Sequence, residues 1–454
     1  MKNTASRSKF VLVLAGILLF GLLTFVIRYF MFADRWISHS HRSGTASIQK
    51  VTDRSGTVLY APNEDQVYAK DAMVRKAALH LLGDREERID ALAIKQYIPQ
   101  LVGFDKLNGT YGNEDGTGIL ELTVDGRIEA VALQALNGKK GTVGVYNYKT
   151  GEILCAISSP TFDPYDPPEI TDANAEQYEG AYLHRFFSYT YTPGSIFKLV
   201  TVAAALENVP DITEQTFTCE GYVYVNGERI NCQGGKAHGE QTLEQALANS
   251  CNCAFAEITQ QVGAKNLINK VRQIGLTESM FVDGYYTKAG TFDKAFSEAN
   301  NLAWAGIGQH TDMVNPCQYM TYMGAIANGG KAAMPYLVSS VESGGAQRYK
   351  ARRTYTNSMI TGSAARVLTE MMHNNVVKMY GAVNLPNVEV CAKSGTAERA
   401  GHENTATFAG FINDERYPLA FVVVVEEGGA GSAACAPIAA AVLKQCISVL
   451  NEES

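Results

Sequence analysis

One uninterrupted apolar segment near the N-terminus constrains this chain more than any other feature of its sequence. Phe10–Ile27 contains 18 residues without a charge, which is just long enough for a helix to cross the hydrocarbon core of a bilayer. Aromatic residues follow the segment, where a cleaved signal peptide would have small residues at its cleavage site. The sequence therefore predicts an uncleaved membrane anchor over residues 10–32, preceded by a cytoplasmic tail over residues 1–9.

The composition is typical of a large globular protein. Its 454 residues are 46% hydrophobic and 19% charged, which excludes a disordered or collagen-like protein. The net charge is −7 and no dense basic stripe follows the N-terminal leader, so a nucleic-acid partner is not expected. Nine cysteines in a chain of this length are too sparse for a disulfide framework.

The patterns after the anchor change near residue 140. Residues 33–140 mix short strand patterns with helical ones at Asp71–Leu82, Glu86–Tyr97 and Val124–Leu136, which predicts a small α+β module. Residues 141–454 are predicted to form the larger domain.

The larger domain begins and ends with strand patterns. Thr142–Tyr148 and Ile153–Ser158 predict a hairpin, and Thr407–Ile412 and Leu419–Val425 predict two more strands before a helix over Pro437–Leu450. A sheet that opens near residue 142 and closes near residue 425 must enclose the helix-rich stretch between them. The expected fold class is α/β (α+β), with an antiparallel sheet flanked by helices and a helical subdomain.

A possible nucleophile precedes an apolar helical pattern. Ser195 and Lys198 are three residues apart, so they share one face of a helix that continues into Leu199–Leu206. A serine hydroxyl needs a neighbouring base, and a lysine with a lowered pKa can be that base. The same spacing at Ser6–Lys9 and Ser47–Lys50 shows that the pair alone predicts nothing.

Two further elements follow the serine in order. Ser250-Cys251-Asn252 follows the helical pattern Leu243–Ala248, and Lys393-Ser394-Gly395-Thr396 follows Val388–Val390 and Cys391. Each element alone is explained as well by a helix cap or a turn. The ordered set of three predicts a catalytic constellation.

With these elements the sequence resembles the penicillin-binding proteins, the acyl-serine transferases of cell-wall synthesis, and among them the class B transpeptidases with one N-terminal anchor. The resemblance covers nearly everything after residue 140 and includes Ala237-His238-Gly239, Gly306-Ile307-Gly308-Gln309 and Gly428-Gly429. It implies a penicillin-binding-protein transpeptidase domain over 141–454 and a pedestal module over 33–140.

The resemblance also implies a role for each catalytic candidate. Ser195 would attack the carbonyl between two terminal D-alanines of a stem peptide, and Lys198 would act as its general base. Ser250 would relay a proton to the leaving amine, Asn252 would bind the substrate amide and hold Lys198, and Lys393 would keep Lys198 neutral.

The third element would also bind substrate. The backbone N–H groups of Ser195 and Thr396 would form an oxyanion hole. The hydroxyls of Ser394 and Thr396 would bind the terminal carboxylate, at a site that Gly395 keeps open to the backbone.

The remaining candidates concern cysteines and metals. Cys219 and Cys232 flank a predicted hairpin and are candidates for a disulfide if the domain is extracytoplasmic, and the sequence leaves open whether they are bonded. The sequence contains no HExxH and no paired CxxC, so no metal site is expected, and no cofactor is implied.

Other functions remain open. A class A β-lactamase is disfavoured because no glutamate lies around Asp283–Thr291, whereas a D,D-carboxypeptidase and a non-catalytic membrane sensor of β-lactams or wall peptides share the same motifs. The resemblance implies stem peptides and β-lactams as ligands and a polytopic membrane glycan polymerase as partner. Since arginines follow the anchor as well, its orientation is inferred from the substrate: a single-pass protein of the cell membrane with an extracytoplasmic catalytic domain.

Overall fold

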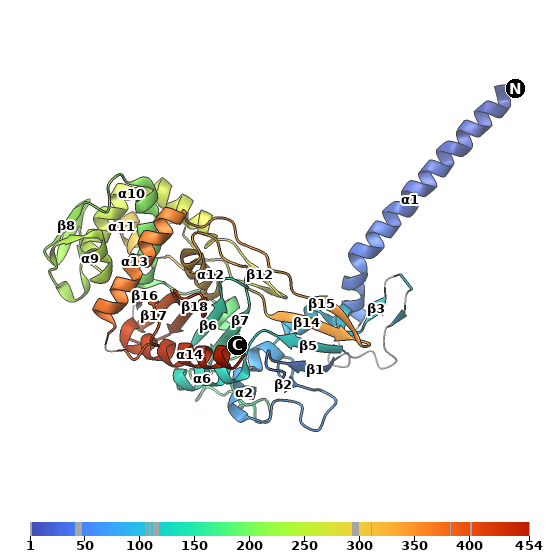
Figure 1. Cartoon of the computed structure of the whole chain (residues 1–454), viewed down its shortest axis with the longest axis horizontal. Coiled ribbons are helices and arrows are strands. Elements are labelled where there is room, and N and C mark those ends of the chain that lie inside the picture. The colour runs from blue at the N-terminus through green and yellow to red at the C-terminus, as the bar shows by residue number, and fades with distance from the viewer. Residues whose placement is uncertain are drawn as a thin grey trace.

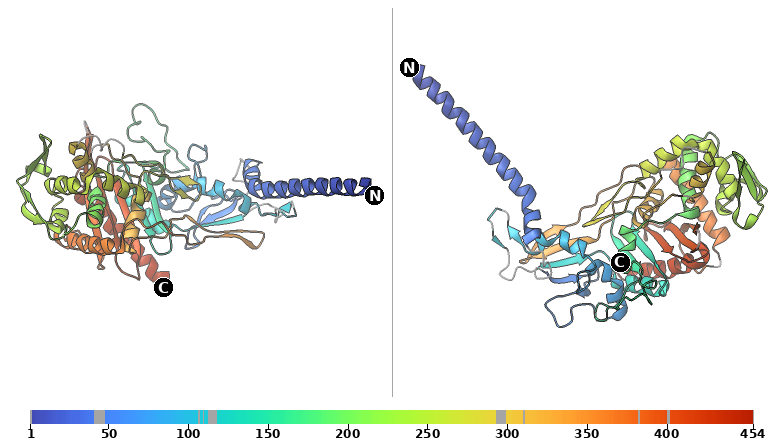
Figure 2. Two further views of the ribbon diagram at one scale, coloured as in Figure 1. Left: turned by 90° about the horizontal axis from the view of Figure 1, so that it is seen from above. Right: turned by 180° about the vertical axis from the view of Figure 1, so that it is seen from behind.

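The computed structural model describes residues 2–40, 48–105, 107–108, 110–111, 118–292, 299–309, 311–381, 383–399 and 402–453. The N-terminal segment forms the long helix α1 (Lys2–Ser40), which projects away from the rest of the molecule (Figures 1 and 2). Within Arg7–Ala33, an 18-residue window has a mean hydropathy of 3.0 and is 0% buried, so this helix is long and apolar enough to span a membrane. In the second helix that passes the same test, Gly431–Glu453, 56% of the apolar window is buried, and this helix belongs to the core.

A mixed five-stranded sheet forms the part of the molecule next to α1. Its strand order is β15-β14-β5-β1-β2, with β1 parallel to β5 and the other pairs antiparallel. The strands are β1 (Ile48–Thr52), β2 (Val58–Tyr60), β5 (Gly118–Leu122), β14 (Val338–Ser343) and β15 (Ala346–Lys350). The last two strands come from the far part of the chain, so this sheet is not built from residues 33–140 alone.

Short helices accompany this sheet. They are α2 (Ala72–Ala77), α3 (Leu79–Leu82), α4 (Leu92–Gln96), α5 (Ile98–Leu101) and α6 (Gly126–Leu136), and a small ribbon pairs β3 (Phe104–Asp105) with β4 (Thr110–Tyr111). The helix expected over Asp71–Leu82 is therefore divided in two. The one expected over Glu86–Tyr97 is helical only at its end, because Asp84 accepts bonds from the Arg88 side chain and the Ile89 N–H and holds the chain in a loop.

A second five-stranded sheet, wholly antiparallel, forms the centre of the larger domain. Its order is β16-β17-β18-β6-β7, so strands near residue 145 pair with strands near residue 422 as the sequence predicts. The strands are β6 (Gly141–Asn147), β7 (Ile153–Ser159), β16 (Val390–Arg399), β17 (His402–Ile412) and β18 (Leu419–Val425). All seven residues of β18 are buried, because helices cover both faces of the sheet.

The two faces of this sheet belong to different apolar layers. Alternate residues of β18 point to opposite sides: Val422 packs in the core shared with α12 (Pro316–Ala327), whereas Val423 packs in the core shared with α6 and α14 (Gly431–Glu453). Figure 1 shows α14 running beneath the sheet beside α6. The helix expected over Pro437–Leu450 is the central part of α14.

A helical subdomain lies at the end of the molecule remote from α1 (Figure 1). Its helices are α8 (Lys198–Asn208), α9 (Leu243–Ala248), α10 (Asn252–Ile274), α11 (Ala299–Ile307) and α13 (Gly362–Met379). Its short elements are η2 (Gly194–Phe197), β8 (Thr216–Cys219), β9 (Tyr222–Val225), β10 (Glu228–Asn231), η3 (Gln233–Gly235) and β11 (Gly239–Thr242). The short helix α7 (Arg185–Ser188) packs on β6 and β7 of the central sheet. The hairpin of β12 (Phe281–Val282) and β13 (Tyr285–Tyr286) lies against the N-terminal module, where Tyr285 donates to the carbonyl oxygen of His80. The predicted helical insertion is confirmed.

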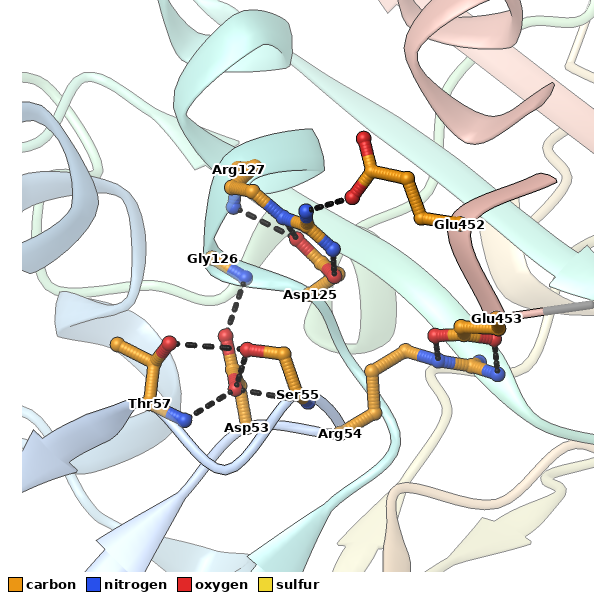
Figure 3. Close-up of polar contacts among 9 residues, drawn as sticks. All are labelled: Asp53, Arg54, Ser55, Thr57, Asp125, Gly126, Arg127, Glu452 and Glu453. Carbon is orange, nitrogen blue, oxygen red and sulfur yellow. Dashed lines mark hydrogen bonds and ion pairs between the residues drawn. The ribbon is translucent and has the colours of Figure 1, made fainter. Parts of the chain in front are cut away.

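Charged side chains join the N-terminal turn to the end of α14 (Figure 3). Arg54 makes two hydrogen bonds of 2.9 Å to Glu453, and Arg127 donates to Glu452 at 2.5 Å. Buried Asp53 accepts bonds from the N–H groups of Ser55, Thr57 and Gly126, which holds the β1–β2 turn against α6. The same helix therefore contacts the pedestal side at one end and the central sheet along its length.

Candidate active site

The fold brings the three sequence elements together in one cleft. Ser195 lies in the 3-10 turn η2, Ser250 and Asn252 lie at the start of α10, and Lys393 lies on β16. A cavity of about 640 Å³ is lined by Ser195, Ser250, Asn252 and Thr396 together with the loop 231–235. Three segments that are far apart in the sequence thus meet at one site.

The serine and its neighbouring lysine are arranged for proton transfer. Lys198 is the first residue of α8, and its Nζ lies 3.0 Å from Ser195 Oγ. This distance is within hydrogen-bond reach, as a nucleophile and its base require. The helix N-terminus also favours negative charge that develops near Ser195.

The second element holds the Lys198 amine in place. Lys198 Nζ is 2.7 Å from the carbonyl oxygen of Ser250, 2.8 Å from Asn252 Oδ1 and 3.3 Å from Ser250 Oγ. Ser250 has φ of 54°, a left-handed conformation that a non-glycine residue adopts only when its surroundings enforce it. This backbone turn directs both its carbonyl and its hydroxyl at the amine.

A second buried lysine completes this cluster of polar side chains. Lys393 Nζ lies 3.2 Å from Ser250 Oγ and 3.0 Å from the carbonyl oxygen of Ser394. Ser250 Oγ therefore bridges the two amines. In the described parts of the chain, neither amine has a carboxylate within ion-pair distance.

Burial lowers the pKa of both amines. Desolvation is the main cause at Lys198, the charge of Lys393 is the second, and together they lower its pKa from 10.5 to about 7. Desolvation alone lowers the pKa of Lys393 to about 7. Two adjacent amines with lowered pKa values share protons, so one neutral amine is available near neutral pH. Lys393 thus contributes to the neutral state of Lys198, but burial contributes more.

Two glycines allow the serine turn to pack directly on β16. A Cβ atom at Gly395 would lie 2.6 Å from the carbonyl oxygen of Pro193, and one at Gly194 would lie 2.7 Å from that of Thr396. Both are closer than real Cβ contacts allow. Gly194 also has φ of 61°, which favours glycine. The close approach places the backbone of Ser195 beside that of Thr396.

The two hydroxyls of the third element lie in different places. Thr396 lines the cleft, and its Oγ1 accepts a bond from the N–H of Gly431 at the start of α14. Ser394 is not among the cleft-lining residues; its Oγ lies 2.8 Å from the hydroxyl of Tyr380, which also accepts the Ser394 N–H. The structure therefore brings together Ser195, Lys198, Ser250, Asn252, Lys393 and Thr396, and turns Ser394 toward α13.

Other residues at the cleft were not selected from the sequence. Gln309 Nε2 donates to the carbonyl oxygen of Thr396 at 3.0 Å, and Trp304 lines the wall on the α11 side. Asn252 Nδ2 donates to the carbonyl oxygen of Asn231, so the loop after β10 forms part of the cleft. Gln309 could have been found from its place in the Gly306-Ile307-Gly308-Gln309 motif, whereas no local signal marks Trp304 or Asn231.

The candidate disulfide between Cys219 and Cys232 is not present in the structure. Their sulfur atoms lie 3.5 Å apart, well beyond a disulfide bond, and both residues are free thiols. The predicted hairpin between them is present as β9 and β10. The thiols instead contact other sulfurs, because Cys232 Sγ is also 3.5 Å from the sulfurs of Cys251 and Cys253.

The fold and the cleft define a class of protein: a serine acyltransferase in which buried lysines take the place of histidine. Residues 141–444 match the family model described as the penicillin binding protein transpeptidase domain, and the chain belongs to this family.

Relatives of known name support this assignment. The chain is 29% identical over 367 residues to the peptidoglycan D,D-transpeptidase PbpA of Mycobacterium tuberculosis, in an alignment that covers 74% of each chain. The solved imipenem acyl-enzyme complex of penicillin-binding protein A from M. tuberculosis has a TM-score of 0.75 and 26% identity, and covers 89% of this chain and 99% of that one. The penicillin-binding protein PBP2 of Helicobacter pylori, solved in complex with MreC, has the same fold, with a TM-score of 0.64, 20% identity and coverage of 74% and 65%.

Proposed function

We propose that this protein is a peptidoglycan D,D-transpeptidase that crosslinks stem peptides through an acyl-serine intermediate and is acylated by β-lactams. The observation that carries the proposal is the 3.0 Å separation between Ser195 Oγ and the buried amine of Lys198. Family membership and the similarity to a named D,D-transpeptidase agree with it.

The first half-reaction forms the acyl-enzyme. Ser195 Oγ bonds to the carbonyl carbon of the penultimate D-alanine while its proton passes to neutral Lys198 Nζ. The C–N bond to the terminal D-alanine then breaks, and its nitrogen receives a proton from Lys198 through Ser250 Oγ, which lies 3.3 Å from that amine. The N–H groups of Ser195 and Thr396 would stabilise the oxyanion, and losing one such donor lowers rates by about 10²–10³.

The second half-reaction releases the serine. An amine from a neighbouring stem peptide attacks the acyl carbon, loses a proton through the same relay, and the bond to Ser195 Oγ breaks. A β-lactam takes the place of the donor peptide in the first step. The opened β-lactam ring stays bonded to the carbonyl carbon and so remains on the enzyme.

Substrate binding would involve other polar groups at the cleft. Asn252 would bind a substrate amide while its Oδ1 holds Lys198 at 2.8 Å. Thr396 Oγ1 would bind the terminal carboxylate, beside Gly395. Ser394, which contacts Tyr380, would position the strand and the carboxylate site instead of contacting substrate directly.

The helix α1 supports a membrane location. We propose a single-pass anchor over residues 10–32, a cytoplasmic tail over residues 1–9 and an extracytoplasmic remainder, with a pedestal over residues 33–140 and the catalytic domain over residues 141–454. The exposed apolar surface of α1 and the adjacent pedestal would contact a polytopic membrane glycan polymerase. The Helicobacter neighbour was solved with a protein partner, MreC.

Labelling with fluorescent penicillin tests the nucleophile. Full-length protein in detergent should become labelled, Ser195→Ala should not, and Ser6→Ala should label normally because Ser6 has the same spacing to a lysine outside the cleft. Labelling of Ser195→Ala would overturn the assignment of the nucleophile.

A second assay separates the possible activities. Donor stem pentapeptide with an acceptor amine should give crosslinked product and free D-alanine. Free D-alanine without crosslinked product would instead show a D,D-carboxypeptidase. Penicillin labelling without turnover of any peptide would show a sensor.

A further inference from the structure

Beside the catalytic cleft lies a compact group of soft donor atoms that the proposed reaction does not use. Cys219, Cys232, Cys251 and His238 each offer one sulfur or nitrogen atom, and all four atoms lie within 4.8 Å of one another. The three cysteines are at most 2% exposed, and His238 is half-buried. We propose that these four residues bind one zinc ion.

The distances fit a tetrahedral ion. Zn–S bonds of about 2.3 Å and a Zn–N bond of about 2.0–2.1 Å place sulfurs about 3.8 Å apart and sulfur about 3.6 Å from nitrogen. Cys232 Sγ lies 3.5 Å from the sulfurs of Cys219 and Cys251, and His238 Nδ1 lies 3.5 Å from Cys219 Sγ and 3.7 Å from Cys232 Sγ. A contraction or expansion of a few tenths of an ångström would accommodate the ion.

The backbone around the sulfurs also suits thiolate ligands. The N–H of Gly221 points at Cys219 Sγ at 3.4 Å, and the N–H of Ala254 points at Cys251 Sγ at 3.5 Å. Hydrogen bonds to ligating sulfurs orient them and stabilise their charge. Soft thiolates with one imidazole in a tetrahedral arrangement favour zinc over magnesium or calcium.

The four ligands come from four different segments. Cys219 ends β8, Cys232 follows β10, His238 precedes β11 and Cys251 caps α10. Their spacing in the sequence matches none of the short zinc motifs, which is why the sequence did not suggest a metal. Only the folding of the hairpin against α10 brings them together.

The position of the site suggests what the ion does. Cys251 lies between Ser250 and Asn252, and Cys232 follows Asn231, whose carbonyl accepts the Asn252 Nδ2 bond of 3.0 Å. An ion bound to both cysteines would tie the loop after β10 to the second catalytic element. It would be a structural ion, since four protein ligands leave no open position for substrate.

Metal analysis of the full-length protein, purified in detergent with a reductant, tests the proposal. We expect about one zinc per chain, as a closed four-ligand site predicts. Binding converts three thiols to thiolates, so addition of zinc to metal-free protein should release up to three protons. Cobalt added in place of zinc should give the visible absorption of a tetrahedral thiolate complex, which requires no variant.

Matched variants locate the site. Cys232→Ser and His238→Ala should lose the zinc. Cys253→Ser should keep it, because Cys253 Sγ contacts Cys232 Sγ at 3.5 Å but is not one of the four convergent ligands. Zinc retained by Cys232→Ser would overturn the proposal.

Two results with the wild-type protein would also overturn it. Nine free thiols with no zinc would mean a simple cluster of thiols, and two missing thiols with no zinc would mean a disulfide. Zinc content is measured without any reaction, so its failure leaves the transpeptidase proposal intact. Where both hold, removal of zinc should slow penicillin labelling while Ser195 remains reactive.

Discussion

The catalytic cleft and the junction at the end of α14 place positively charged side chains in opposite surroundings. In the cleft, Lys198 and Lys393 are buried and contact hydroxyl, amide and carbonyl oxygens. At the junction, Arg54 and Arg127 are paired with Glu453 and Glu452 (Figure 3). The first arrangement lowers the pKa of both amines, as the proposed base requires, whereas the second stabilises the contact between two parts of the chain.

The difference between the lysines and the arginines follows from their exposure to solvent and from the partners that they contact. A buried amine without a counter-charge gains most by losing its proton, so its pKa falls. A guanidinium stays charged, and a partly exposed carboxylate satisfies it at little free-energy cost. Burial of the amines in the cleft therefore lowers stability and makes an amine reactive. The ion pairs at the junction add modest stability and take no part in the reaction.

The largest expected effect comes from removing the cleft amine. Lys198→Met should lower the penicillin acylation rate by about 10²–10⁴, because Ser195 loses its base. The thermal unfolding midpoint should not fall, since a buried unpaired amine is replaced by an apolar side chain of similar volume. Labelling kinetics and calorimetry measure the two effects.

The matched control is a buried lysine that has a carboxylate partner. Lys270 lies 2.5 Å from Glu207 and is remote from the cleft, so Lys270→Met should acylate normally but unfold at a lower temperature. If Lys198→Met also lost stability, the contrast between paired and unpaired cations would fail.

The pH profile gives the next largest effect. With the pKa of Lys198 lowered to about 7, the acylation rate should rise about tenfold per pH unit below that value and level off above it. Lys393→Met should shift this profile upward in pH, because the neighbouring charge helps lower the pKa of Lys198. A rate that does not change between about pH 5 and 8 would exclude Lys198 as the base.

The same pKa shift predicts how stability responds to pH. Between about pH 7 and the ordinary lysine pKa of 10.5, the unfolded chain binds more protons than the folded one. Lys198 therefore destabilises the folded state fully at and below about pH 7, and this destabilisation is relieved as pH rises through the window toward 10.5. Lys198→Met should remove that part of the dependence.

The smallest effect is expected at the junction. Arg54→Ala should lower the free energy of unfolding by at most about 1 kcal/mol, because the pair is partly exposed. A double-mutant cycle of Arg54→Ala with Glu453→Ala should give a coupling energy of similar size. These variants should be acylated at the wild-type rate. A change in acylation larger than about threefold would mean that α14 transmits strain to Thr396, whose hydroxyl accepts the Gly431 N–H.

Much of the fold was predictable because its signals are local. Alternating or continuous apolar runs gave the strands around residues 145, 155, 409 and 422, and the uncharged apolar segment near the N-terminus gave α1. The strands β14 and β15 were not predicted as part of the N-terminal sheet. The partner of β14 is β5, which precedes the whole central sheet in the sequence, and no local pattern carries such a distant pairing.

The candidate site shows the same division between features that local sequence predicts and contacts that only the fold decides. Residue types and order selected Ser195, Lys198, Ser250, Asn252 and Lys393 as candidates, and the structure brings these five side chains together. The direction of the Ser394 hydroxyl was not predictable, since Tyr380 comes from the end of another helix. The sequence left the pairing of Cys219 and Cys232 open for a similar reason: Cys232 has three sulfur neighbours, not one.

The sequence by itself determined which reactive side chains this protein possesses. It also determined how its apolar segments divide into anchor, strands and helices, because both depend on residue type and short spacing. The tertiary structure alone decided which of those groups meet. Burial of two amines around Ser250, and convergence of three thiols and an imidazole beside it, depend on contacts between distant segments. Distance and desolvation, which set pKa values and metal affinity, exist only once those segments are packed together.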